Sequence, residues 1–166
     1  IYYNIKCSII RIFKCEVFDC MLPIMTMAAK TGRIYEQFCA PVCRKYCLSQ
    51  TAFDILIFLA NNENFNTARD IFRMRGIKSG IVSVTVENLI RAGYLRREND
   101  PKDRRVQRLV LLPESAAVIE AGRQVQSAFI ETLLRDITPG EREIFAEVTG
   151  KLIKTIDQLD AGEKKL

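Results

Sequence analysis

The chain has 166 residues, 48% of them hydrophobic and 27% charged, with a formal net charge of +5. That composition is typical of a folded globular protein with one ordinary core, and it argues against intrinsic disorder. The chain contains no histidine, the commonest general base. It shows neither a Gly-rich phosphate loop nor a Ser or Cys nucleophile motif, so it is not expected to be an enzyme.

The first third combines apolar runs with six cysteines, at positions 7, 15, 20, 39, 43 and 47. Charged residues interrupt every apolar run before the roughly 18 residues that span a bilayer, so neither a membrane segment nor a secretory signal is expected. Without a secretory context, the cysteines are predicted to be reduced and the protein cytoplasmic. Within residues 1–20, apolar positions recur at helical spacing and favour an amphipathic helix.

The periodicity from residue 23 onward predicts two long helices. The first covers residues 23–47 and should be kinked or broken at Pro41, which lacks a backbone N–H donor. Ser49 is expected to cap the second helix, with Leu48 packing onto Phe53. That helix should stop at the polar run 61–66, which is predicted to be a surface loop.

Two short helices and a hairpin are predicted next. Thr67-Ala-Arg-Asp70 has the spacing of a capping box, and Gly76 should end the helix that it opens. The next helix should start at residue 78 or 79 and end at Gly93. Two strand-like runs, 94–97 and 106–111, then flank a charged loop. A short helix, a turn, a helix and a hairpin in succession are the plan of a winged helix-turn-helix.

The C-terminal third is predicted to be helical. One helix should cover residues 113–137. Thr138-Pro-Gly-Glu141 then has the cap, the first-position proline and the acidic residue of a helix start, and the last helix should carry an apolar face as far as Leu159.

Positive charge is concentrated in the segment Arg69–Arg108. This segment carries eleven Lys or Arg and five Asp or Glu, a net charge of +6, which leaves −1 for the rest of the chain. Such a concentration indicates a surface for a polyanion.

The same segment resembles a known family. Residues 82–97, ending in Ala-Gly-Tyr-Leu-Arg-Arg, followed by Asp100-Pro-Lys-Asp-Arg-Arg105, are similar to the recognition helix and wing of the MarR family of bacterial transcription regulators. The resemblance covers roughly residues 24–160. It implies a mainly α (α+β) fold, a winged helix-turn-helix with long N- and C-terminal dimerisation helices.

The resemblance also implies how the chain is organised and what it binds. The expected boundaries are dimerisation helices over 1–48, a DNA-binding lobe over 49–112 and further dimerisation helices over 113–166, all within one compact domain. The expected function is that of a homodimeric repressor on double-stranded, pseudo-palindromic DNA, released by a small aromatic effector. The DNA is expected to be A·T-rich, because a planar guanidinium fits a narrow A·T minor groove.

The predicted DNA-binding residues lie on the second short helix and in the charged loop. On the helix, Lys78 is expected at a phosphate, and Val84 offers apolar contact to a thymine methyl group. In the loop, Asp103 is expected to hold an arginine by ion pairing, as the family does with this aspartate. The full set is Lys78, Ser79, Gly80, Ser83, Val84, Glu87, Lys102, Asp103, Arg104 and Arg105.

The spacing of three cysteines leaves a second function open. Cys39, Cys43 and Cys47 are spaced to share one helical face, where they could serve as core side chains, as redox sensors or as metal ligands. The core reading is favoured, and without histidine a zinc site would need thiolates or carboxylates alone; neither a metal nor a cofactor is expected. One alternative function is therefore a redox-sensing regulator of the same fold. The other is a winged-helix protein-interaction module without DNA binding, against which the net charge of +6 argues.

Overall fold

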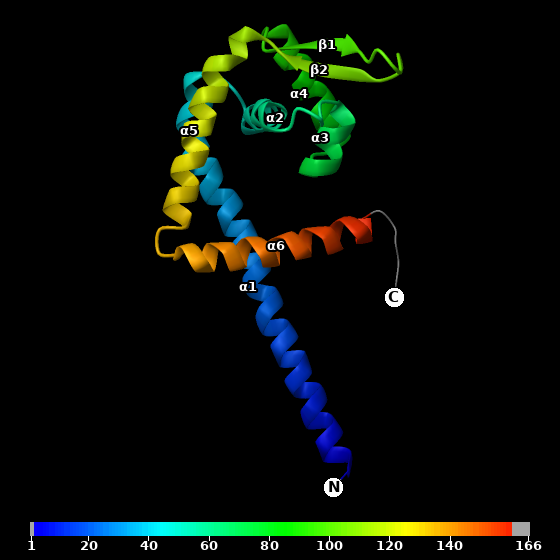
Figure 1. Ribbon diagram of the computed structural model, residues 1–166, viewed down its shortest axis with the longest axis vertical. Helices are drawn as coiled ribbons and strands as arrows, with labels where there is room; N and C mark the ends of the chain where they lie inside the picture. The colour runs from blue at the N-terminus through cyan, green and yellow to red at the C-terminus, as the bar shows by residue number, and fades with distance from the viewer. Residues whose placement is uncertain (1, 161–166) are drawn as a thin grey trace. The chain divides into compact units, whose positions relative to one another are not determined.

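The computed structural model describes the backbone of residues 2–160 and the side chains of residues 23–159 (Figure 1). By its contacts the chain divides into two compact units, Ile1–Val125 and Gln126–Leu166, with the boundary inside a helix. The first unit holds the winged lobe and the second a pair of helical segments. Within the described residues, no helix is both long and apolar enough to cross a bilayer.

The first helix, α1 (Tyr2–Lys45), is continuous. Of the kink or break predicted at Pro41, the break is absent, since the helix runs through this residue. Pro41 is exposed, as is Gln37 one turn earlier, so water can solvate the carbonyl group that loses its partner. The helix ends where Cys47 adopts a left-handed conformation with φ 52°. The backbone of residues 2–20 is helical as expected, but their side chains lie outside the described residues.

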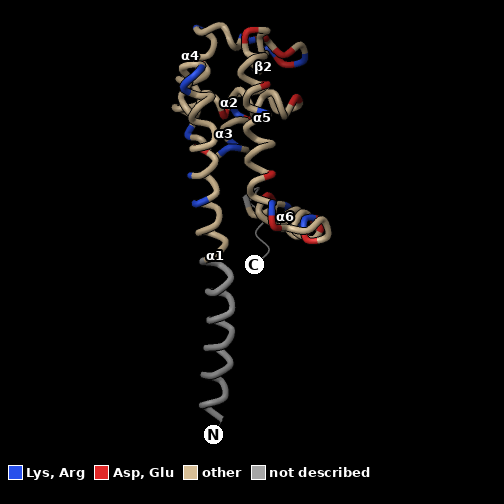
Figure 2. Tube along the Cα trace, turned by 90° about the vertical axis from the view of Figure 1, so that its left-hand side faces the viewer, with Lys and Arg blue, Asp and Glu red and all other residues tan. Residues whose placement is uncertain are grey.

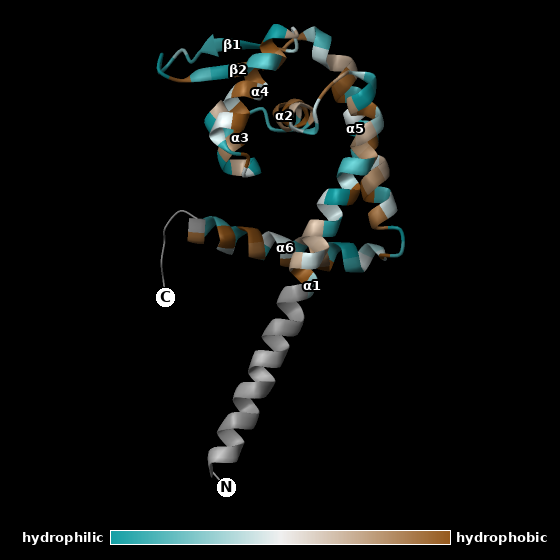
Figure 3. Cartoon of the chain, turned by 180° about the vertical axis from the view of Figure 1, so that it is seen from behind, coloured by the Kyte–Doolittle hydropathy of each residue, from teal (hydrophilic) through white to brown (hydrophobic). Residues whose placement is uncertain are grey.

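Helix α2 (Gln50–Asn61) forms the centre of the winged lobe (Figure 1). The predicted cap is confirmed, because the Ala52 amide donates to Ser49 Oγ at 3.2 Å. Seven of the helix's side chains are buried, and Figure 3, in which α2 is seen end-on, colours much of the helix hydrophobic. Gly122 of α5 packs so closely on it that an added Cβ would lie 2.3 Å from Ile57 Cδ1.

Helices α3 (Ala68–Arg75) and α4 (Ser79–Arg91) form the helix-turn-helix. The predicted capping box is confirmed: Thr67 Oγ1 accepts from the Asp70 amide, and Asp70 accepts from the Thr67 amide. Gly76 ends α3 in the left-handed conformation, with φ 62°, where a side chain would be strained.

The wing is an antiparallel hairpin of β1 (Leu95–Asn99) and β2 (Gln107–Leu111). Its register pairs Leu95 with Leu111 and Asn99 with Gln107. The first strand thus continues two residues beyond the run 94–97 expected from the sequence. Leu95 and Leu109 are buried in the lobe's core, which anchors the hairpin to the helices.

Beyond the hairpin, the predicted helix 113–137 is shorter than expected. It opens with a 3-10 turn, η1 (Pro113–Ser115), and continues as α5 (Ala116–Leu133). Helix α6 (Pro139–Asp160) starts at the predicted cap, where Thr138 Oγ1 donates to Glu141 at 2.7 Å. The Arg142 guanidinium donates to the Leu134 and Ile137 carbonyls at 2.6 and 3.0 Å and so closes the turn between the two helices.

Helix α6 has an apolar face that its own chain leaves exposed. Large side chains recur at helical spacing with exposures of 48–63%, and Figure 3 shows apolar and polar bands along the helix. They are Ile144, Phe145, Val148, Leu152, Ile153, Ile156 and Leu159.

Candidate nucleic-acid interface

Helix α4 has a buried face and an exposed face. The buried face consists of Val82, Thr85, Val86 and Leu89, each at most 9% exposed. On the other side lie Ser79, Gly80, Ser83 and Val84, all exposed. Ser83 Oγ donates to the Ser79 carbonyl at 3.0 Å, and Val84 is 63% exposed. The α4 residues predicted to meet DNA therefore share the solvent-facing side, with an apolar position at its middle.

The N-terminus of α4 offers a site for an anion. Lys78 is the N-cap and is exposed, and its side chain does not cap the helix. Amide groups of a first helical turn lack intrahelical partners, and the helix dipole is positive there. A phosphate at this end would meet both the amide groups and the lysine.

Glu87 differs from the other predicted residues because it is half-buried and paired. Its Oε2 lies 2.9 Å from Nη1 of Arg97 on β1. The pair joins α4 to β1 of the wing. Arg97 was not among the predicted site residues, and nothing in the local sequence spacing indicates that the two side chains meet.

The wing loop is organised by Asp100 rather than by Asp103. The Asp100 carboxylate accepts the Lys102 and Asp103 amides at 2.7 and 3.0 Å and forms an ion pair with Arg108. The prediction that Asp103 pairs with an arginine is corrected by the structure, in which Asp103 Oδ1 accepts the Arg105 amide at 3.0 Å. Asp103 thus shapes the backbone at the tip of the loop.

The ion pairs divide the positive charges of Arg69–Arg108 into two groups. Four arginines face carboxylates: Arg75 with Asp54, Arg96 with Glu98, Arg97 with Glu87 and Arg108 with Asp100. The remaining basic residues have no ion pair within the described part of the chain: Arg69, Arg73, Lys78, Arg91, Lys102, Arg104 and Arg105. Charges of both signs mark the hairpin in Figure 2. The positive charges without a carboxylate partner are therefore on α3, at both ends of α4 and at the wing tip.

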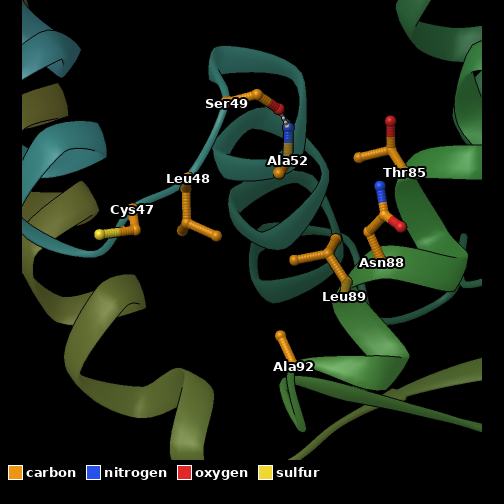
Figure 4. A pocket seen from close by; sticks show the side chains of 8 residues that line it. All are labelled: Cys47, Leu48, Ser49, Ala52, Thr85, Asn88, Leu89 and Ala92. Carbon is orange, nitrogen blue, oxygen red and sulfur yellow. Dashed lines mark hydrogen bonds between the residues drawn. The ribbon is translucent and has the colours of Figure 1, made fainter.

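A small pocket lies behind α4, between it and the start of α2 (Figure 4). Its volume is about 250 Å³. No charged residue lines it, and Thr85 and Asn88 contribute polar side chains to its wall on α4. The lining residues are Cys47, Leu48, Ser49, Ala52, Thr85, Asn88, Leu89 and Ala92.

The structure separates the three candidate cysteines. Cys39 and Cys43 are buried in the core beside α2, whereas Cys47 lies beyond the end of α1 and is exposed. Burial is the main cause that raises the pKa of both the Cys39 and the Cys43 thiol. The three residues therefore do not share one helical face, and two of them pack as small apolar side chains.

Comparison with known proteins agrees with this geometry. Residues 48–106 match the model of the MarR family. A relative from Bacillus subtilis, the uncharacterized HTH-type transcriptional regulator YcgE, is 30% identical over 95 residues, which are 55% of this chain. The matched segment spans 60% of that relative's length.

Solved structures extend the likeness to most of the fold. A MarR protein from Peptoclostridium difficile has a TM-score of 0.72 at 18% identity, covering 86% of this chain and 92% of that one. The DNA complex of S. aureus MepR has a TM-score of 0.66 at 16% identity, covering 79% and 94%. Helices α3 and α4 and the paired hairpin make this part of the chain a winged helix-turn-helix in fold, and residues 48–106 are similar to the MarR family.

Proposed function

We propose that the protein is a sequence-specific regulator of transcription that binds double-stranded DNA as a homodimer and acts as a repressor. The observation that carries this proposal is the set of basic side chains without carboxylate partners on α3, at the ends of α4 and at the wing tip. These are the elements with which a winged helix-turn-helix meets phosphates and grooves. The fold is also that of S. aureus MepR, whose structure is a DNA complex.

In this proposal, α4 reads bases in the major groove. Ser83 and Glu87 offer hydrogen-bonding groups and Val84 an apolar contact to a thymine methyl group, while Lys78 holds a phosphate. At the wing, Arg104 and Arg105 reach an A·T-rich minor groove, with Lys102 beside them. One valine and two polar groups make few contacts to base edges, so phosphate contacts and the wing supply much of the binding affinity.

The exposed apolar face of α6 supports the homodimer. A fully buried Leu, Ile or Phe side chain contributes about 1.5–3 kcal/mol relative to an exposed one, and α6 exposes seven large apolar side chains along one helix. A second copy of the chain would cover them. Two-fold symmetry of the protein then requires a pseudo-palindromic operator.

The pocket behind α4 supports release by a small ligand. A neutral aromatic molecule in it would contact the start of α2 and the inner face of α4 at once, with Thr85 and Asn88 as hydrogen-bonding groups (Figure 4). A ligand that favours a different spacing of these helices lowers the population that fits DNA.

Redox sensing by cysteines has less support. The thiolate is the reactive form, and burial keeps Cys39 and Cys43 protonated.

The first experiment selects bound fragments from random DNA and measures affinity by fluorescence anisotropy over a range of salt concentrations. We expect steep weakening with salt, with Arg105→Ala lowering affinity for every duplex and reducing the salt slope by about 1. Glu114→Gln, in the exposed turn η1, is the control and should leave the affinity and the salt slope unchanged. Equal affinity of the wild type and Arg105→Ala would refute the wing's role, and failure to bind any duplex would refute the function.

A further inference from the structure

Asp100 stands at the junction of β1 and the wing loop, and its carboxylate holds both sides of the hairpin. It is 6% exposed. Oδ1 accepts the Lys102 and Asp103 amides, and Oδ2 accepts Arg108 Nε at 2.5 Å. The Lys102 amide first, and then the Arg108 guanidinium, hold the pKa of Asp100 below its ordinary value, so the carboxylate is charged at neutral pH.

Arg108 continues this connection to the helix-turn-helix. Its Nη1 donates to Asn66 Oδ1 at 3.0 Å. The Asn66 carbonyl in turn accepts the Leu109 amide at 2.7 Å, and Thr67, the cap of α3, pairs with Arg108 in an isolated β-bridge. The base of the wing loop is therefore bonded to the segment that directly precedes α3.

We propose that Asp100, Arg108 and Asn66 form a wing lock, which sets the direction of the wing tip relative to α3 and α4 without contacting DNA. Arg108 is occupied by Asp100 and Asn66, so its charge serves the fold of the wing. The Asp100 carboxylate, a negative charge within a basic surface, thus sets the direction of Arg104 and Arg105 at the tip. This inference rests on the proposed DNA binding.

The wing lock and simple electrostatics predict opposite changes in DNA affinity when the negative charge of Asp100 is removed. Asp100→Asn raises the net charge by one, so electrostatics alone predicts tighter DNA binding. If the carboxylate positions the wing, Asp100→Asn instead weakens binding by about tenfold and lowers the salt slope by about 1, because a charged hydrogen-bond network and the phosphate contacts that depend on it are lost.

Glu98→Gln is the matched control. It removes the same charge from the same hairpin, but Glu98 is an exposed partner of Arg96 on β1. We expect its affinity to equal or exceed that of the wild type. A second pair changes no charge: Asn66→Ala should weaken binding in the same direction as Asp100→Asn, whereas Asn64→Ala, in the same loop and exposed, should not.

The measurements are affinity and salt slope on the full chain, with the selected duplex and a scrambled duplex, and amide hydrogen exchange of Lys102 and Asp103. Far-UV circular dichroism confirms that each variant is folded. Exchange at both amides should be faster in Asp100→Asn and unchanged in Glu98→Gln. The lock is overturned if Asp100→Asn binds as tightly as Glu98→Gln, or if the two amides exchange at the wild-type rate. A wild type that binds no DNA defeats the proposed function instead, and the exchange result still decides whether Asp100 holds the loop.

Discussion

Asp54 on α2 shows how a single carboxyl group links the helices of the lobe. Its Oδ1 accepts Gln50 Nε2 at 3.0 Å, and its Oδ2 lies 4.0 Å from Arg75 Nη2 at the end of α3. Burial outweighs these partners and raises the pKa of Asp54 above its ordinary value. The surroundings of Asp54 therefore favour the neutral form of its carboxyl group over the charged form.

We expect Asp54→Asn to be more stable than the wild type at pH 7. A raised pKa in the folded state favours protonation, so the stability that Asp54 contributes is present below its ordinary pKa and is lost as pH rises through the folded value. The amide keeps the shape of the carboxyl group without the charge. Melting temperatures at pH 4 and pH 7 should show a larger gain at pH 7.

Glu63→Gln, on the exposed loop after α2, is the control for Asp54→Asn. Its melting temperature should follow that of the wild type at both pH values. Lower stability of Asp54→Asn at pH 7 would mean that the attraction to Arg75 outweighs burial, contrary to the expectation.

At the scale of an element, α6 is a helix whose apolar face needs a cover. The capping box at Thr138 and the Arg142 hydrogen bonds fix where it starts. Helical periodicity then places every large apolar residue along one side. Neither feature depends on a partner, so the helix presents a preformed surface.

We expect Ile156→Glu to weaken the proposed homodimer. Ile156 is 61% exposed on the apolar face of α6, and a carboxylate buried there without a partner costs more than the roughly 1.4 kcal/mol that corresponds to a tenfold change in affinity. The dimer dissociation constant, measured by analytical ultracentrifugation, should rise by at least about tenfold.

Lys154→Glu, which changes charge on the polar side of the same helix, should leave the dimer intact. If Ile156→Glu sediments as the wild type does, the subunits meet through a different surface.

At the scale of the whole molecule, local sequence signals predicted most of the fold. The caps at Ser49, Thr67 and Thr138 and the helix end at Gly76 were all predicted correctly, because each depends on residues within a few positions of one another. The placement of the predicted α4 residues on an exposed side follows from the same periodicity.

The errors arose where distant segments meet. Asp100, rather than Asp103, forms an ion pair with an arginine, Arg108. Arg108 also donates to Asn66, which lies 42 residues earlier in the chain, and local sequence spacing does not indicate such a contact. Glu87 and Arg97 belong to different elements that only the folded lobe brings together. Pro41 remains inside α1 because it is exposed, which its neighbours in sequence do not reveal.

Gly122 lies where α5 packs on α2, and alanine, the best helix former, would not fit there without displacing its neighbours. Alanine in a helix is usually favoured over glycine by about 1 kcal/mol. Here its methyl group would collide with the Ile57 side chain and press on Phe53. We expect Gly122→Ala to lower the free energy of unfolding by about 1–3 kcal/mol, measured in urea. Local helix preference and close packing therefore oppose each other at this position. A series from glycine to alanine to serine, in order of size, would increasingly separate α5 from α2 without changing any charged residue.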